Sequence, residues 1–148
     1  MQPMHAVAGG GQVDVWRDNL DPAVADGGWR LRSLLRSGAV LAFGSDWPVV
    51  PIDPMLEIHA AVRRQTPDGE PSGGWLPEEG LAVADALAAA TWGSAYAEHA
   101  ELERGHLAPG AIADVIVLDR DLLREGTDAI AGTRVLLTVV GGEVVHAT

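Results

Sequence analysis

The segment Leu41-Ala42-Phe43-Gly44-Ser45-Asp46-Trp47-Pro48-Val49 is the stretch on which the fold prediction depends. An apolar run over residues 39–43 ends there in a Gly-Ser turn that presents one carboxylate. Such a continuous apolar run is typical of a short parallel strand that is buried on both faces. Functional groups in parallel α/β proteins gather where strands end, so Asp46 is a candidate catalytic base or metal ligand.

The segments on either side of this turn predict helices. Residues 29–36 place leucines at helical spacing, and Gly38 follows as a C-terminal cap. After the turn, Asp53 and Pro54 form an N-cap and first-turn pair. Core-type side chains then recur at i, i+3, i+4 and i+7 over residues 55–62, which predicts a second amphipathic helix.

The next part of the chain predicts a long loop and then more helix. Residues 66–77 are rich in Pro, Gly, Asp, Glu and Ser, which is typical of a loop long enough to be functional. Residues 82–98 are rich in Ala and predict one helix, or two short ones broken near Trp92-Gly93. Either form would pack against a sheet.

The pattern changes after Arg104-Gly105. Residues 114–119 predict a strand, and residues 134–140 and 143–147 are two β-rich runs separated by Gly141-Gly142, a strong hairpin signal. The chain therefore divides into an α/β portion over residues 1–103 and a small β portion over residues 104–148.

Composition sets further bounds. The 148 residues suffice for one domain or a piece of one, but a complete β/α barrel needs roughly 250. A net charge of −11, with no lysine, argues against nucleic-acid and anionic-membrane partners. Because cysteine is absent, any metal must be held by His and carboxylates. No signal peptide and no 18-residue apolar window is visible, so we expect a cytoplasmic protein.

At this point the residues carry a family resemblance. Met1-Gln2-Pro3-Met4-His5-Ala6, then the Leu41–Val49 stretch, then residues 105–121 and 135–145 resemble, in that order, the C-terminal part of the amidohydrolase superfamily. The nearest group is amidohydrolase 3, the formamide-deformylase-like metal-dependent hydrolases. The resemblance implies an α/β fold: the last two units of a TIM-like β/α barrel, followed by the C-terminal part of a small β-sandwich. Residues 1–3 would end the seventh barrel strand, and residues 39–43 would be the eighth.

The resemblance also implies an activity, the hydrolysis of C–N bonds in amides, formamides or imides by metal-activated water. Asp46 matches the aspartate that contacts the metal and takes the proton from the metal-bound water. His5 matches the histidine of the Gln-Pro-x-His segment, where we expect substrate or oxyanion contact. Trp47 would form an apolar wall of the substrate pocket. The implied cofactor is a divalent metal, zinc by its donor types, and the implied partner is a small amide-type substrate.

Much of the family's metal site has no counterpart in this chain. The first-strand His-x-His pair, the bridging lysine or glutamate, and the histidines after strands five and six are absent. A stable catalytic zinc normally needs three protein ligands. We therefore expect this chain alone to be inactive, as a fragment completed by the missing N-terminal part of the same protein or by a homo-oligomer. Open strand edges should make it dimerise, swap elements or aggregate.

Each candidate residue also has a structural alternative. Asp46 could cap the turn through its own side chain, His5 could be a solvated terminal histidine, and Trp47 could pack in the core. His59 is expected to be a packed, hydrogen-bonded histidine, since it lies on the apolar face of its helix. Arg63 is expected to complement the C-terminus of that helix.

The tryptophan of the long loop and the glycine run near the N-terminus give two further predictions. Trp75 lies in the long loop, where an aromatic has little core to join, so its position predicts a lid or pocket role. The glycines at 9–11 do not form a phosphate loop, because no Lys-Ser/Thr follows and no strand precedes them.

Two alternatives to a hydrolase fragment remain from the sequence. One is a non-enzymatic binding or interaction module that keeps the scaffold without metal. The other is a structural fragment that pairs with another polypeptide to rebuild a barrel.

Overall fold

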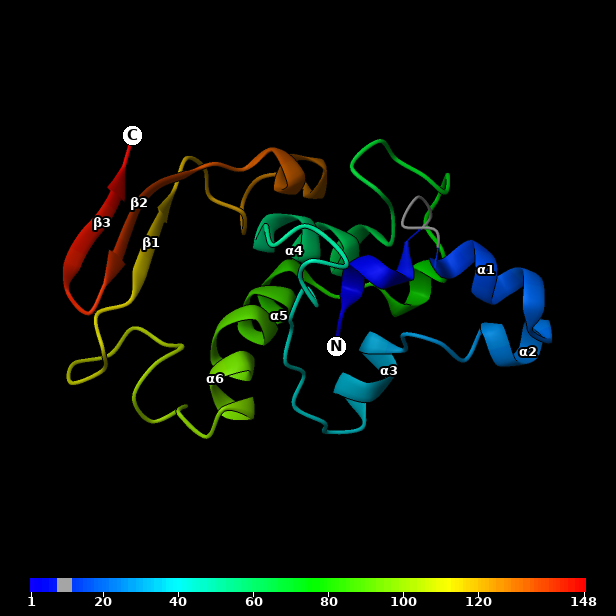
Figure 1. The fold of residues 1–148 in the computed structure, drawn as a ribbon, viewed down its shortest axis with the longest axis horizontal. Coiled ribbons are helices and arrows are strands. Elements are labelled where there is room, and N and C mark those ends of the chain that lie inside the picture. The colour runs from blue at the N-terminus through cyan, green and yellow to red at the C-terminus, as the bar shows by residue number, and fades with distance from the viewer. Residues whose placement is uncertain (8–11) are drawn as a thin grey trace.

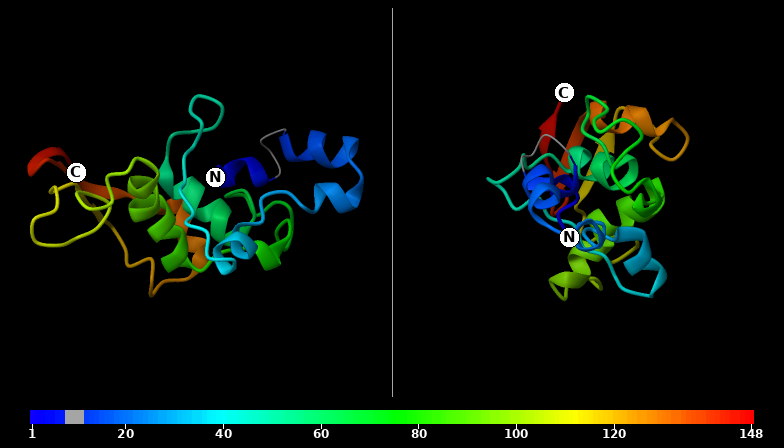
Figure 2. Two further views of the ribbon diagram at one scale, coloured as in Figure 1. Left: turned by 90° about the horizontal axis from the view of Figure 1, so that it is seen from below. Right: turned by 90° about the vertical axis from the view of Figure 1, so that its right-hand side faces the viewer.

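The computed structural model describes residues 1–7 and 12–148, and within them the side chains of all but residues 12–14. The glycines at 9–11 therefore lie outside the described residues. Figures 1 and 2 show a small sheet at one end of an elongated molecule, helices packed around α4 in the middle, and α1 and α2 at the other end. In chain order the elements are η1 (Pro3–Ala6), α1 (Gln12–Asn19), α2 (Pro22–Ala25), α3 (Leu31–Arg36), α4 (Pro54–Arg63), η2 (Pro77–Glu79), α5 (Val83–Ala88), η3 (Ala89–Gly93), α6 (Ser94–Ala97), β1 (Val115–Leu118), η4 (Thr127–Gly132), β2 (Val135–Val140) and β3 (Glu143–Ala147).

The two helices around the turn form where their caps predict. α3 ends before Gly38, whose φ of +90° is a conformation that glycine adopts without strain. α4 begins after Asp53, whose side chain accepts a hydrogen bond from the N–H of Met55 at 2.8 Å. Both helix predictions are confirmed because capping is a local interaction between neighbouring residues.

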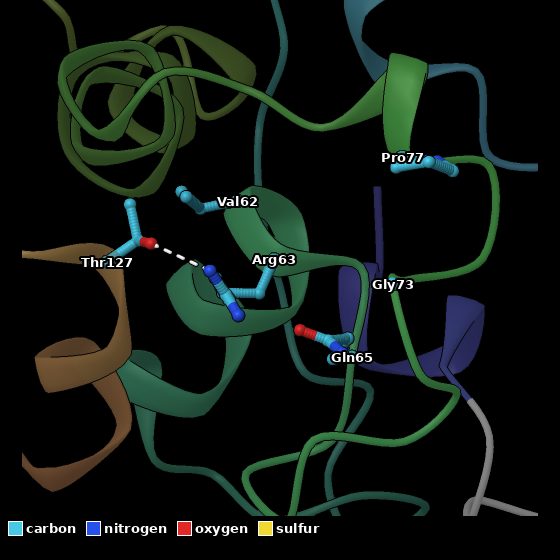
Figure 3. A pocket seen from close by; sticks show the side chains of 6 residues that line it. All are labelled: Val62, Arg63, Gln65, Gly73, Pro77 and Thr127. Carbon is cyan, nitrogen blue, oxygen red and sulfur yellow. Dashed lines mark hydrogen bonds between the residues drawn. The ribbon is translucent and has the colours of Figure 1, made fainter.

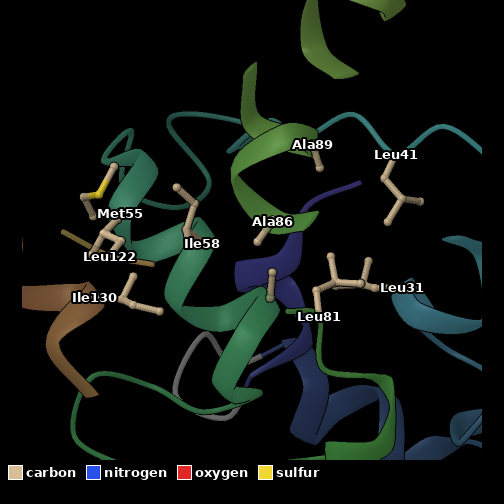
Figure 4. Packing of buried hydrophobic residues seen from close by; sticks show 10 residues of the cluster. Leu31, Leu41, Met55, Ile58, Leu81, Ala86, Ala89, Leu122 and Ile130 are labelled. Atoms are coloured by element: carbon tan, nitrogen blue, oxygen red, sulfur yellow. The ribbon is translucent and has the colours of Figure 1, made fainter. Parts of the chain in front are cut away.

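α4 is the central helix of the molecule. It is covered by η1, α5 and η4, so polar as well as apolar positions on it are buried. Glu57 and His59 are only 3% and 5% exposed. The predicted helix is confirmed, and burial extends beyond the apolar positions that the sequence pattern indicates. The core around α4 is shown in Figure 4 and contains Leu31, Leu41, Met55, Ile58, Ala61, Leu81, Ala86, Ala89, Leu122 and Ile130.

Residues 39–43 are extended, but the predicted regular strand is not formed within the described residues. A strand needs a ladder of backbone hydrogen bonds to a neighbour, and the described residues offer this segment only isolated ones. Leu41 is buried against the helices, and the N–H of Phe43 donates to the carbonyl of Ala89 at 3.2 Å. The prediction of a run buried on both faces holds only for Leu41, because Val40 is 42% exposed and the described residues supply no full ladder of hydrogen bonds to this segment.

Residues 83–97 form one continuous helical segment with a π turn inside it. α5 passes into η3, a π-helical stretch, and then into α6, so the expected break near Trp92-Gly93 is a change of helical pitch instead. The π turn packs directly on the extended segment, because a β-carbon added at Gly93 would overlap the carbonyl oxygen of Leu41. Only glycine permits this approach.

The C-terminal strands form an antiparallel sheet in the order β1-β2-β3. Gly141 and Gly142, with φ of +57° and +88°, make the predicted hairpin turn between β2 and β3. In register, Val115, Val139 and Val144 lie side by side, as do Val117, Leu137 and Ala147. Mixed helix and antiparallel sheet agree with the α/β class. No helix among the described residues is long and apolar enough to cross a lipid bilayer.

A second apolar cluster corrects the expectation for Trp75. This side chain is 7% exposed and packs edge-on to Trp29, with 5.9 Å between ring centroids. The guanidinium of Arg64 lies 5.4 Å from its ring centroid, and Arg64 Nε donates to the Trp75 carbonyl at 3.0 Å. Trp75 therefore anchors the long loop to the end of α4 and is not a lid.

Candidate functional site

The turn after residues 39–43 leaves the Asp46 carboxylate free. The N–H of Val49 donates to the Asp46 carbonyl at 2.8 Å, and the N–H of Trp47 donates to Ser45 Oγ at 3.2 Å. The turn is thus closed by the backbone and by the serine. The exposed Asp46 side chain makes no hydrogen bond to another described residue, so it does not serve as the capping group.

Asp46 also adopts an unusual backbone conformation. Its φ is +58°, in the left-handed region, where a residue with a β-carbon is strained by about 1 kcal/mol or more. Aspartate tolerates this region better than most residues, and such conformations cluster at functional sites. In this conformation the Asp46 side chain is exposed to solvent.

The N-terminal segment meets this turn through Met1. The Met1 nitrogen donates to the Ala42 carbonyl at 2.6 Å, and the N–H of Gly44 donates to the Met1 carbonyl at 3.1 Å. In parallel strands, one residue bonds in this way to the two residues that flank its neighbour, here Ala42 and Gly44 on either side of Phe43. These bonds bring the segment that carries His5 to the base of the Asp46 turn.

His5 and Trp47, the other sequence-predicted residues, have different environments. His5 lies in η1, is half-buried, and its Nε2 is shielded from solvent without a hydrogen-bond partner. Trp47 is 65% exposed, so it is not packed in the core of the described residues. His5 thus has an unused ring nitrogen, and Trp47 has an apolar face available for further contact.

Glu57 is a residue that the sequence did not indicate. One carboxylate oxygen, Oε2, accepts a hydrogen bond from the N–H of Met4 at 3.3 Å, while Oε1 is buried without a partner among the described residues. Burial raises the pKa of Glu57 to about 7, while the Met4 hydrogen bond and the Met1 amino group oppose this rise. In the sequence Glu57 resembles an ordinary acidic residue near a helix start, and only the three-dimensional covering of α4 distinguishes it.

A cavity of about 150 Å³ lies between Glu57 and the Asp46 turn. Glu57 is the one residue with an ionisable side chain among those that line it, and the remaining lining is backbone, one hydroxyl and apolar carbon. The lining residues are Phe43, Gly44, Ser45, Ile52, Pro54, Glu57 and Ala90. The cavity is therefore an apolar space with one buried acid beside the turn.

Ser94 fixes the other side of the same segment. Its Oγ lies 3.1 Å from both the Phe43 carbonyl and the Ala89 carbonyl. Because the π turn changes the helical register, Ala89 also accepts from the N–H of Phe43. Phe43 is thus held through both of its backbone polar groups by the helical segment.

The described residues do not fit a metal by themselves. No group of three or more His, Asp or Glu side chains placed to hold a metal occurs in residues 1–7 and 12–148. Asp46 offers the right kind of donor, a free carboxylate, but a catalytic zinc normally needs three protein ligands. His99, His106 and His146 are exposed or far along the chain and add nothing to the turn.

A larger cavity of about 370 Å³ lies at the C-terminal end of α4, away from this site (Figure 3). Its polar groups already have partners: Arg63 donates to Thr127 at 3.1 Å and pairs with Asp128 at 3.0 Å, and Gln65 donates to the carbonyls of Gly69 and Pro71. Arg63 lies in the last turn of α4, as predicted, and its side chain also ties α4 to η4.

His59 is the packed histidine that the sequence predicts. Its Nε2 lies 3.2 Å from the Thr66 carbonyl, and burial lowers its pKa. It is a structural residue on the opposite side of α4 from any predicted ligand role.

Comparisons with known proteins agree with the order of motifs. The model of the amidohydrolase family matches residues 1–146. Protein LONG AFTER FAR-RED 3 of Arabidopsis thaliana is 37% identical over 115 residues, which cover 78% of this chain and 19% of that protein. YtcJ of Bacillus subtilis (strain 168), named for an amidohydrolase, is 32% identical over 115 residues, covering 78% and 22%.

A third relative is the N-substituted formamide deformylase of Arthrobacter pascens, 32% identical over 112 residues, which cover 76% of this chain and 20% of that enzyme. The chain thus spans about a fifth of the length of the curated relatives it matches. No solved structure gives a significant match.

Proposed function

The chain belongs to the amidohydrolase family, and from that premise we propose that it is the C-terminal part of a hydrolase of C–N bonds in small amides, formamides or imides. The same proposal includes a barrel fold for the complete protein, in which residues 1–3 and 39–43 would be the ends of adjacent parallel strands. The parallel bonding of Met1 to both sides of Phe43 supports this reading. The uncovered strand segment would then be completed by polypeptide beyond this chain.

One observation carries the proposal, the free carboxylate of Asp46. The turn is closed without it, its backbone is in the left-handed region, and it faces solvent beside the segment of His5. A turn that only had to reverse the chain would gain from a glycine at this strained position. A carboxylate held there at an energetic cost is consistent with chemistry at this point.

In the proposed reaction Asp46 is the base. Its carboxylate oxygen accepts a proton from the water that attacks the carbonyl carbon, and the same proton is then delivered to the departing amine nitrogen. The C–N bond breaks in that second step, so a carboxylic acid and an amine leave the site. His5 would contact the substrate oxygen through its unused Nε2, and Trp47 would cover the substrate's apolar part.

The metal belongs to the completed protein. Because one carboxylate is not a metal site, we infer that a divalent ion, zinc by its donor types, would be held mainly by ligands outside this chain, with Asp46 as one contact. The chain alone should then neither retain zinc nor hydrolyse amides. We further propose that the protein acts in the cytoplasm, with a small amide-type molecule as its substrate.

The test uses the complete protein that contains this chain and 4-nitroformanilide, whose hydrolysis releases 4-nitroaniline. Asp46→Asn keeps the size of the side chain but removes its basicity, so kcat should fall by about 100-fold or more. The matched control is Asp68→Asn, an exposed aspartate in the loop beyond α4, which should stay within about twofold of the wild type. Unchanged turnover in Asp46→Asn would refute the assigned role.

A further inference from the structure

Glu57 connects the two segments on which the proposed site depends. It is contributed by α4, it bonds to the N–H of Met4 next to His5, and it shares a cavity with Ser45 next to Asp46. His5 and Asp46 lie 41 positions apart in the sequence, and Glu57 is on a third element. Its position is therefore that of a link between them.

The chemistry of Glu57 makes a purely stabilising role a poor explanation. The side chain is 3% exposed, and one of its oxygens has no hydrogen-bond partner in the part of the chain that the structure describes. A buried polar atom without a hydrogen bond costs free energy, and an apolar side chain of the same size would avoid that cost. A carboxylate kept at this position consequently serves something other than the stability of the core.

We propose that Glu57 is a positioning residue that holds the His5 segment against the Asp46 turn through its hydrogen bond to Met4. This inference rests on the proposed function, because the geometry it maintains matters only if His5 and Asp46 act on one substrate. Met1 fixes the start of the segment by its bonds to Ala42 and Gly44, and Glu57 fixes it three residues later. Two points of attachment set both the place and the direction of η1.

Three variants separate positioning from stability. Glu57→Gln keeps an oxygen that can accept from the Met4 N–H, whereas Glu57→Leu keeps similar bulk and removes the acceptor. The control is Glu79→Leu. Glu79 is also 3% exposed and also accepts from a backbone N–H, that of Ser33 at 2.9 Å, but it does not line the cavity.

The first readout is amide hydrogen exchange in the full chain, which needs no substrate. Glu57→Leu should speed exchange in the peptide over residues 1–7 at least tenfold without lowering the unfolding midpoint, and Glu57→Gln should stay within about threefold of the wild type. Glu79→Leu should instead loosen the peptide around Ser33. Equal loosening of all peptides by Glu57→Leu, or none over residues 1–7, would overturn the proposal.

The second readout is turnover of 4-nitroformanilide by the complete protein. Glu57→Leu should lower kcat at least tenfold, and Glu57→Gln should restore most of it, whereas Glu79→Leu should change kcat only as far as it lowers the folded fraction. Equal kcat in Glu57→Leu and the wild type would overturn the positioning role. If the proposed function fails, Asp46→Asn has no effect on turnover, and the exchange result still decides whether Glu57 holds the segment.

Discussion

Glu57 takes up a proton more readily in the folded chain than in the unfolded one, because burial raises its pKa from 4.5 to about 7. A carboxyl group with a raised pKa contributes stability that is fully present below pH 4.5 and is lost as the pH rises toward 7. This contribution of Glu57 to the free energy of unfolding is on the order of 2 kcal/mol after solvent screening. The wild type should therefore lose stability relative to Glu57→Gln between pH 5 and pH 8.

Urea unfolding of both proteins at several pH values measures this difference. Comparison with Glu57→Gln is necessary because His59, whose pKa is lowered by burial, gives a change of opposite sign in a similar range. Both proteins retain His59, so its contribution cancels. A difference that does not change between pH 5 and pH 8 would mean that Glu57 ionises as it does in the unfolded chain.

Single residues show where reading the sequence succeeds and where it does not. Asp46 could be singled out because its neighbours, an apolar run and a Gly-Ser turn, are adjacent in the chain. Glu57 could not, because its burial depends on η1 and α5 covering α4 from distant parts of the sequence. The prediction for Trp75 failed for the same reason, since only the fold brings its partners Arg64 and Trp29 to it.

At the level of elements, Gly93 is the described glycine with the least room for a β-carbon, because the π turn packs on the extended segment there. Gly93→Ala would place a methyl group against the carbonyl of Leu41, so we expect a loss of about 3 kcal/mol. Gly132→Ala, at a glycine with open space around it, should change stability by about 0.5 kcal/mol or less. Thermal unfolding of the two variants beside the wild type tests this, and similar midpoints for both variants would contradict it.

α3, α4, the α5–α6 segment and the hairpin were predictable as elements, whereas α1, α2 and the irregular form of residues 39–43 were not. Asp53, Gly38 and the Gly141-Gly142 pair act on their immediate neighbours, so their effect can be read from the sequence. A strand depends on a partner, and among the described residues Met1 supplies two hydrogen bonds and Ala89 one, too few for a regular ladder. The pitch change at η3 was likewise visible only as a weak break near Trp92.

For the whole molecule, the exposed sheet is the feature that most favours self-association. One face carries only apolar side chains in register, and on it Val117 and Val144 are 44% and 62% exposed. A cavity of about 480 Å³ beside β1, near Leu107, shows that the helices do not fill this region either. Apolar surface of this kind drives association in water.

We therefore expect the purified 148-residue chain to self-associate as its concentration rises. Val144→Lys should shift the mass measured by light scattering toward the monomer value of 15.5 kDa, because a charge opposes burial of that face. The control is Val24→Lys, at a valine 57% exposed on α2 at the far end of the molecule. A wild-type chain that remains monomeric at all concentrations would show that the sheet needs no cover.

The rings of Trp16, Trp29 and Trp75 pack edge to face, with centroids 5.4 and 5.9 Å apart. Their packing can therefore be followed by ultraviolet spectroscopy without an added label. Indole rings so close and so inclined share their electronic transitions, which separated tryptophans do not. Their circular dichroism and emission thus depend on whether the segment after α2 is docked on the loop beyond α4. The ultraviolet spectrum of the unlabelled chain therefore reports whether two regions about 45 residues apart in the sequence are docked on each other.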